Sequence, residues 1–457
     1  MLKYLFRYNA PKTWVLIHVA LGLVSAFTPL PLVAFFYLFL FSSIIYIFKN
    51  KKVDPPLAIL IAYLSSFELI TRLAQTSPLI PYELGKYILF FLLIAGVLIR
   101  ARPGKEGLLL LVLLLPAFSF DLSGEATFRD IRFNLLGTIN IALAVWLFQN
   151  LLFTEKGINL VLISLVLPLI SALAFTIFQT PSFDEIEFSY GGTFSTTGGF
   201  GPNQVSTAFG LGAFLTFYLW LNKFKLSGSR TLDAGIAVLF TFQGLLSFSR
   251  GGMIGGLLGV LIVLYFTVFK KGVKQRTGLN IKRIKRNLLV GSIFLFAAAF
   301  TANALTGGML INRYKGETAG TLSGTKEKTL STITTHRYDI LIGDIDLFLD
   351  AGFFGVGAGA SKYLREELNG IVAHVEASRL IAEHGVLGII YIFIMFYLMY
   401  KVWISRKNRT YKGLLLSFIV IGWYTTFHAA TRTYISPLLI GLSMIIIERQ
   451  HVALLRK

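Results

Sequence analysis

The chain has 457 residues, of which 55% are hydrophobic and only 14% charged. An average soluble domain carries about 25% charged residues, so this composition excludes a soluble globular protein. It predicts a polytopic membrane protein instead. Cysteine is absent, which excludes disulfides, thiolate metal sites and cysteine nucleophiles.

Apolar segments of bilayer length recur from one end of the chain to the other. Taking about 20 residues for each crossing, we expect an all-α bundle of about 12–14 transmembrane helices. The first apolar run follows Lys3, Arg7 and Lys12 without a clear small-residue cleavage site, and we interpret it as an uncleaved first helix. The predicted helices cover 13–27, 32–48, 57–75, 84–99, 107–119, 134–153, 157–178, 203–221, 233–248, 250–269, 287–305, 381–400, 413–430 and 434–447.

The formal charge of +20 is spread over alternate connections. One side of the predicted bundle carries 29 Lys and Arg against 5 Asp and Glu, and the rest of the chain carries 14 against 18. Because basic connections stay in the cytoplasm, both termini are expected there. The orientation of the protein in a lipid bilayer thus explains its net positive charge, and we expect no nucleic-acid partner. The basic groups are Lys49/Lys51/Lys52, Arg100/Arg102/Lys105, Lys223/Lys225/Arg230, the run 270–286, Arg406/Lys407/Arg409 and Arg456/Lys457.

Two connections on the opposite, outer side are unusually long, and they divide the chain. Residues 1–305 hold helices one to eleven with an outer loop at 179–203, whose second half is the Gly-rich GGTFSTTGGFGPNQ. Residues 306–380 form a large periplasmic loop, and 381–457 hold the C-terminal helices and a cytoplasmic tail. Loops of this length are functional or disordered, and the polar stretch 318–335 is expected to be a mobile flap.

Signatures of soluble enzymes and of metal sites are missing. No GxxxxGK[ST], HExxH or GxSxG pattern occurs, and GVGAGAS at 355–361 is interpreted as a Gly-rich turn. The six histidines form no i,i+4 pair, so we expect no metal and no cofactor.

Ionisable residues near the outer ends of the helices are therefore the main candidates, because charges are costly there and often functional. Arg250 in FSRGG is either an anion-binding residue or an interfacial arginine that reaches for water. Glu68 and Arg72 have the i,i+4 spacing of an ion pair within one helix, and structural pairing is favoured.

The stretch IVAHVEASRLIAEHG at 371–385 is the most informative. His374 precedes a membrane helix, and imidazole acts as a base near neutral pH. On a helix of 100° per residue Glu376, Arg379 and Glu383 share the face opposite His374. They converge with it only if the helix begins after residue 374. Arg379 is thus either a structural ion-pair partner or a ligand-binding residue.

The order of these motifs resembles that of the O-antigen ligase family, the Wzy_C-type lipid-linked glycan transferases. The resemblance covers roughly 190–400. Its parts are GTF…PN (192–194 and 201–203), SRGG (249–252), an Arg-led helix ending in GVGAG (337–359), and H-x-E…AEHGxxG from His374.

This resemblance implies a membrane enzyme that transfers a glycan from undecaprenyl pyrophosphate to an acceptor hydroxyl, without a metal or a cofactor. It implies that His374 is the catalytic base and that Arg250 and Arg337 bind pyrophosphate, with Arg379 as a further candidate and Asn203 as a loop contact. The family often has Asn after this His; here Val375 stands there, so Glu376 is expected to orient the imidazole.

The chemistry is also reasonable from the residues alone. A pyrophosphate is a good leaving group, so a positioned base and several arginines with their planar, bidentate forks are sufficient. Direct displacement by the acceptor inverts the anomeric configuration. The acceptor is either lipid A–core, which makes the chain a ligase, or a second lipid-linked repeat, which makes it a Wzy-type polymerase. A polysaccharide flippase or other transporter is the alternative from a different class, and it predicts inverted repeats and mid-membrane charges.

Overall fold

The computed structural model describes residues 11–50, 55–99, 104–119, 124–269, 281–366, 368–405 and 409–448. Much of the predicted cytoplasmic charge, including Lys51, Lys52, Arg100, Arg102, Lys270, Lys271, Arg406, Lys407, Arg456 and Lys457, lies outside these described residues. Within them the protein is mostly helical.

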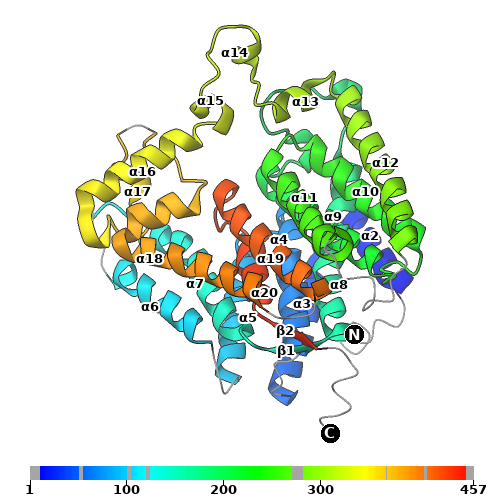
Figure 1. The fold of residues 1–457 in the computed structure, drawn as a ribbon, viewed down its shortest axis with the longest axis horizontal. Helices are drawn as coiled ribbons and strands as arrows, with labels where there is room; N and C mark the ends of the chain where they lie inside the picture. Colours follow the sequence, from blue (N-terminus) through cyan, green and yellow to red (C-terminus); the bar gives the residue numbers. More distant parts are fainter. Residues whose placement is uncertain are drawn as a thin grey trace.

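Each predicted membrane segment coincides with a helix over most of its length (Figure 1). The first half of the chain forms α2 Pro11–Ser25, α3 Leu30–Asn50, α4 Pro56–Leu73, α5 Leu84–Ile99, α6 Lys105–Ser119, α7 Phe128–Phe148 and α8 Glu155–Gln179. It is followed by α9 Pro202–Leu221, α10 Arg230–Leu246, α11 Arg250–Leu264 with a π-helical extension η3 Tyr265–Phe269, and α12 Ile281–Leu305. The last three long elements are α18 Glu376–Ile404, α19 Arg409–His428 and α20 Ile435–Ser443.

Seven helices of the described residues are long and apolar enough to cross a membrane. They are α3, α4, α7, α8, α9, α11 with its extension, and α18. Three shorter apolar helices cover Pro11–Ser25, Leu84–Ile99 and Gly291–Leu305. This is the architecture of an all-α membrane protein.

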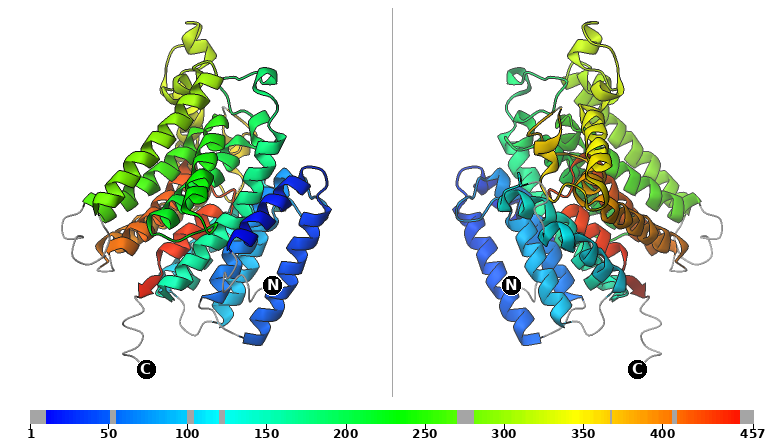
Figure 2. Two further views of the ribbon diagram at one scale, coloured as in Figure 1. Left: turned by 90° about the vertical axis from the view of Figure 1, so that its right-hand side faces the viewer. Right: turned by 90° about the vertical axis from the view of Figure 1, so that its left-hand side faces the viewer.

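The bundle is built around mostly apolar helices that are buried on all sides. Helix α4 is buried along nearly its whole length and packs on α8, which also contacts α2 and α9. Helix α9 lies between α10 and α11, and α19 joins α11 to α20 (Figures 1 and 2). A helix that is apolar all round belongs to the interior of a large bundle, which is where α4 and α8 lie.

Two predicted helix boundaries are wrong. The predicted helix 134–153 ends at Phe148 and the predicted helix 434–447 ends at Ser443. Near the predicted ends the chain instead forms a parallel two-stranded sheet of β1 Leu152–Thr154 and β2 Ile446–Glu448, in which Phe153 pairs with Ile447. Strands of three residues are too short to show a two-residue periodicity, so the apolar runs looked helical.

The described residues of the segment 306–375 include four helices of four to six residues and one of 15 residues. These are α13 Met309–Tyr314, α14 Ala319–Leu322, α15 Leu330–Thr334, α16 Arg337–Ala351 and α17 Ser361–Leu364. Within the predicted flap, α14 and α15 are each preceded by a threonine, Thr318 and Thr329, that caps the first turn through a capping box. The hairpin that carries α14 projects beyond the bundle (Figures 1 and 2). The prediction that it moves is untested.

Helix α18 is interrupted at Gly385, where φ is 59° and ψ is −135°. A Cβ atom at this position would lie 2.2 Å from the carbonyl oxygen of Phe353 and 2.6 Å from the amide nitrogen of Gly355. Only glycine combines this positive φ with such a close approach. The kink thus brings the turn after η4, Gly352–Phe354, against the first part of α18.

Candidate functional site

The candidate site lies where the ends of several helices meet. Arg250 is the first residue of α11, Arg337 is the first residue of α16, Arg313 lies in α13, and Arg432 lies between α19 and α20. We call these four the arginine cluster. The positive charges of Arg250 and Arg337 both act on Arg313, and the charge of Arg337 also acts on Arg432.

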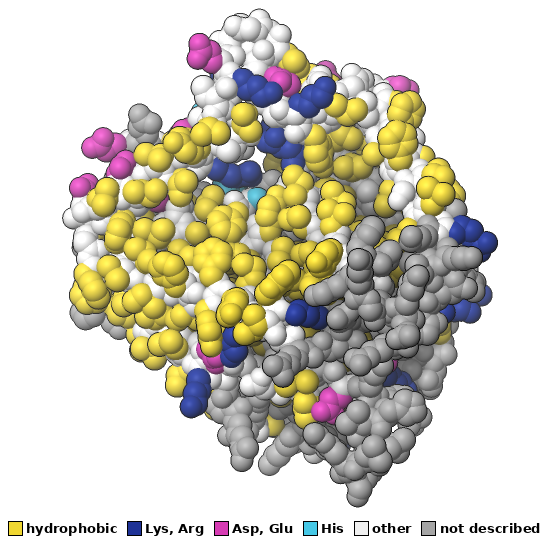
Figure 3. Space-filling model, in the orientation of Figure 1, with side chains coloured by type: hydrophobic (Ala, Val, Ile, Leu, Met, Phe, Trp, Pro, Cys, Tyr) yellow, Lys and Arg dark blue, Asp and Glu magenta, His cyan; other side chains and the backbone are white. Residues whose placement is uncertain are grey.

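The surface shows the same gathering of basic side chains. In Figure 3, Lys or Arg side chains and a His side chain lie at the bottom of a hollow below the hairpin that carries α14 and α15. Apolar side chains cover the surface on both sides of this hollow (Figure 3). A basic site bordered by apolar surface is suited to a ligand with an anionic head and an apolar tail.

Within the described structure the arginine cluster has no carboxylate in ion-pair contact, although the charge of Glu376 acts on Arg432. Among the described residues, none of its four members forms an ion pair with Asp or Glu. Their hydrogen bonds go to backbone carbonyls: Arg250 Nη2 to Ile333 at 2.7 Å, Arg313 Nε to Phe248 at 3.5 Å, and Arg432 Nη2 to Val372 at 3.3 Å and Ala373 at 3.4 Å.

Burial of these cations is energetically unfavourable. Burial, followed by the charges of Arg250 and Arg337, lowers the pKa of Arg313 to about 10. Burial also lowers the pKa of Arg432 to about 10, with Arg379 as the next cause. The Nε atoms of Arg337 and Arg432 are buried and have no hydrogen-bond partner among the described residues. A bound anion would satisfy both the charges and these donors.

His374 lies beside this cluster, two residues before α18. Its backbone carbonyl accepts a hydrogen bond of 3.0 Å from the amide of Ala430, which ties the segment to the α19–α20 turn. Its Nδ1 atom is buried and has no partner within the described structure. Burial, and then the charges of Arg432 and Arg337, lower the pKa of His374 to about 3. The imidazole is therefore neutral at pH 7 and can accept a proton.

Glu376 and Arg379 lie deeper, in the first turn of α18. Arg379 donates to the Glu376 carboxylate and to the side chain of Asn134, and its Nε lies 3.9 Å from Glu383 Oε2. The second Glu376 oxygen accepts hydrogen bonds of 3.1 Å from the amide and the hydroxyl of Thr431. Because α18 begins at Glu376, the helical angle predicted between His374 and this stripe does not apply.

These contacts favour the structural alternative for Arg379, because its donors are taken by Glu376 and Asn134. The Glu376 carboxylate likewise has partners other than His374. The predicted catalytic role of Glu376 and the predicted pyrophosphate contact of Arg379 stay predictions. Glu68 and Arg72 form the expected buried ion pair, and Glu68 also accepts a hydrogen bond of 2.8 Å from the amide of Tyr434.

Asn203, in the first turn of α9, is tied to the start of α11. Its side-chain oxygen accepts a hydrogen bond of 2.8 Å from Ser249, the residue before Arg250, and Ser206 donates to the same serine at 2.9 Å. Thr207 Oγ1 lies 3.1 Å from His428 Nε2. The predicted loop contact is thus placed at the arginine cluster, where it orients the residue preceding Arg250.

The glycines after Arg250 serve helix packing. A Cβ atom on Gly252 would lie 2.2 Å from the backbone of Ser206, and one on Gly256 would lie 2.4 Å from the Gly210 carbonyl oxygen. Close approach of two helix backbones requires such small residues. This packing brings the N-terminal ends of α9 and α11 together, and with them Asn203 and Arg250.

Arg313, Arg432 and His428 were not identified from the sequence as site residues. Arg313 is more than 110 residues before His428 and Arg432 in the chain, so no local pattern connects it with them. One feature of the sequence could have indicated Arg432, because it is a lone cation in a short connection on the predicted outer side.

The described part of the chain contains no group of three or more His, Asp or Glu that could hold a metal ion.

Comparison of the chain with protein-family models, with curated proteins and with solved structures finds no match.

Proposed function

We propose that the chain is a glycosyltransferase that moves a glycan from undecaprenyl pyrophosphate to an acceptor hydroxyl. The observation that carries the proposal is the arginine cluster, without an ion-paired carboxylate among the described residues, beside a neutral histidine at the end of an apolar helical bundle. Arginine binds phosphates through its planar fork. Two adjoining phosphates would occupy donors from several of these arginines at once.

The proposed reaction is a single displacement. His374 takes the proton from the acceptor hydroxyl while its oxygen attacks the anomeric carbon. The bond from that carbon to the pyrophosphate oxygen breaks, and undecaprenyl pyrophosphate leaves with its bonding electrons. Arg250, Arg313, Arg337 and Arg432 stabilise the negative charge that develops on it. The configuration at the anomeric carbon is inverted, and the chain's own residues provide every group that this step needs.

The arginine cluster also controls the histidine. Without substrate, burial of the ring and then the charges of Arg432 and Arg337 hold the pKa of His374 low, which makes the imidazole a weak base. An anionic pyrophosphate neutralises the nearby guanidinium groups and raises that pKa. The base thus becomes stronger when the donor is in place.

We further propose that the protein spans the bacterial inner membrane with 12–14 helices and has both termini in the cytoplasm. The segment 306–380 and the site would then face the periplasm. Lipid A–core is the proposed acceptor, which makes the chain an O-antigen ligase. Transfer to a second lipid-linked repeat would instead identify a polymerase, and an assay that offers both acceptors separates the two.

The base is tested with His374→Ala in purified protein. A positioned base contributes about 10²–10⁴-fold, so turnover per folded molecule should fall by that factor while the lipid-linked donor still binds. The matched control is His336→Ala, because His336 is an exposed histidine of the same part of the chain. Near-normal turnover in His374→Ala, or activity that chelator removes and a divalent ion restores, contradicts this mechanism.

The anion site is tested with Arg250→Lys and Arg337→Lys. Each substitution keeps the charge and removes the bidentate fork, so donor binding and transfer should both weaken at unchanged expression. The control is Arg230→Lys, because Arg230 lies at the opposite end of α10 from the SRGG turn. Full activity in both cluster variants would show that these arginines are structural.

A further inference from the structure

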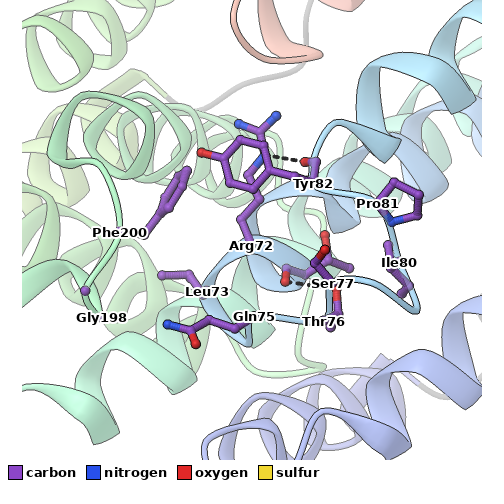
Figure 4. Close-up of a pocket in the computed structure, with 12 residues that line it drawn as sticks. Arg72, Leu73, Gln75, Thr76, Ser77, Ile80, Pro81, Tyr82, Gly198 and Phe200 are labelled. Atoms are coloured by element: carbon purple, nitrogen blue, oxygen red, sulfur yellow. Dashed lines mark hydrogen bonds between the residues drawn. The ribbon is translucent and has the colours of Figure 1, made fainter.

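A pocket of about 240 Å³ lies between the C-terminal end of α4 and the Gly-rich loop before α9. Residues 71–73, 75–77 and 80–82 form one side, and residues 198–200 form the other. Figure 4 shows the Tyr82 ring against the Arg72 side chain, with the Phe200 ring next to them. The centroids of the two rings are 6.0 Å apart. Pockets for drug-sized ligands are about 300–1,000 Å³, so this one has room for a single small ring.

The charge in this pocket is already neutralised. Arg72 forms a buried ion pair with Glu68 and donates from Nε to the Tyr82 carbonyl at 2.9 Å. Its guanidinium carbon lies 4.5 Å from the Tyr82 ring centroid and 5.8 Å from that of Phe200. An arginine with these partners holds the aromatic wall in place. It differs from the arginine cluster, whose members have no carboxylate partner among the described residues.

The remaining lining combines aromatic faces with uncharged polar groups. Tyr82 is 54% exposed, so its ring presents open surface to a ligand. Gln75 and Ser77 are exposed, and the structure gives their side chains no hydrogen bond to other described residues. Carbohydrate rings have apolar C–H faces that pack on aromatic rings and hydroxyls that hydrogen-bond to amide and hydroxyl groups.

The pocket is connected to the arginine cluster through the start of α9. Phe200 is three residues before Asn203, which bonds to the serine preceding Arg250. A ligand that bridges the pocket and the cluster therefore has an uncharged ring next to an anion.

We propose that this pocket is a subsite for one uncharged sugar ring, held by Tyr82, Phe200, Gln75 and Ser77. The assignment rests on the proposed function for the sugar class. The ring belongs either to the donor glycan, next to its pyrophosphate, or to the acceptor. An anionic ring is disfavoured because Glu68 already neutralises Arg72.

Binding is tested without any transfer reaction. Purified full-length protein is mixed with a panel of uncharged methyl pyranosides, and saturation transfer from protein to sugar is measured by NMR. We expect a signal with wild type and a loss of that signal in Tyr82→Ala and in Gln75→Ala. The matched control is Phe194→Ala, because Phe194 is 58% exposed in the same Gly-rich loop and does not line the pocket. Both aromatic sites are open to solvent, so both variants should fold.

Transfer kinetics then identify the source of the ring. Loss of the contacts in Tyr82→Ala should raise KM about tenfold for the substrate whose sugar occupies the pocket. A rise for the lipid-linked donor assigns the donor sugar, and a rise for the acceptor assigns the acceptor sugar. The Tyr82→Phe variant keeps the ring and should stay close to wild type.

The pocket and the proposed function can fail separately. Absence of saturation transfer to wild type, or a signal that persists in Tyr82→Ala, overturns the sugar subsite. So does transfer with unchanged KM values in Tyr82→Ala. If the protein binds the glycosides through Tyr82 but transfers no glycan, the sugar subsite is supported and the proposed function is contradicted.

Discussion

The described residues include buried arginines that pair with a carboxylate and the mostly half-buried arginines of the cluster, and their partners separate the two kinds. Arg379 and Arg72 each pair with a carboxylate on their own helix. The arginine cluster has only backbone carbonyls as hydrogen-bond acceptors among the described residues. A paired buried arginine is part of the fold, whereas an unpaired one is destabilising until an anion arrives. Substitution of a paired arginine should therefore lower stability. Substitution of an arginine of the cluster should instead lower activity without lowering stability.

Arg379→Leu should destabilise the protein. The substitution leaves Glu376 and Glu383 buried without their cation, and breaking a buried pair in this way costs about 3–5 kcal/mol. Thermal unfolding in detergent should show a clearly lower midpoint than for wild type or for Arg250→Lys. An unchanged midpoint together with lost transfer would instead support the ligand-binding alternative for Arg379.

The pH dependence of the rate should report the pKa of His374. Protonation removes the base, so the rate falls as the pH drops through that pKa. In the free protein the pKa is about 3, and bound pyrophosphate should raise it towards the ordinary value of about 6.5. The acid limb of kcat, which reports the complex, is thus expected at higher pH than the acid limb of kcat/KM. Coincident limbs, or limbs in the reverse order, would contradict this coupling.

At the scale of elements, the approach of α9 to α11 positions the site. Gly252 faces the backbone of Ser206 across this contact, so Gly252→Ala should force the helices apart and separate Asn203 from Arg250. Thermal stability and transfer are expected to fall together. The matched control is Gly235→Ala in α10, where an added Cβ meets nothing within 4 Å. That substitution should be neutral or stabilise by about 0.5–1 kcal/mol. Equal stability of the two variants would show that the contact tolerates a methyl group.

Apolar runs of bilayer length predicted the long helices because one property, hydropathy over about 20 residues, determines them. It did not predict the kink at Gly385 or the pairing of β1 with β2, which depend on contacts with distant parts of the chain. The same limit applied to the site: residues that local sequence features indicate were predicted, and residues that depend on distant contacts were not. Arg250, Arg337 and His374 stand at helix ends that the sequence marks, whereas Arg313 and Arg432 reach the site only through tertiary packing.

At the scale of the whole molecule, the arginine cluster and the 222–229 connection lie at opposite ends of α9. This helix has 20 residues and is therefore about 30 Å long, with Asn203 at one end and residues 222–229 following the other. The α14–α15 hairpin belongs to the end with Asn203, because Arg250 donates to the carbonyl of Ile333. If α9 crosses the membrane, the hairpin and the 222–229 connection face different compartments.

Single cysteines test this orientation, because the chain has no cysteine of its own. Thr325 in the hairpin and Lys225 in the basic connection are both exposed, so Thr325→Cys and Lys225→Cys should fold normally. Since basic connections stay in the cytoplasm, a membrane-impermeant maleimide added to intact spheroplasts should label Cys at 325 and label Cys at 225 only after lysis. Labelling of both before lysis would place the arginine cluster on the same side as the basic connections. A periplasmic transfer of lipid-linked glycan would then be impossible at this site, whatever the chemistry of its residues.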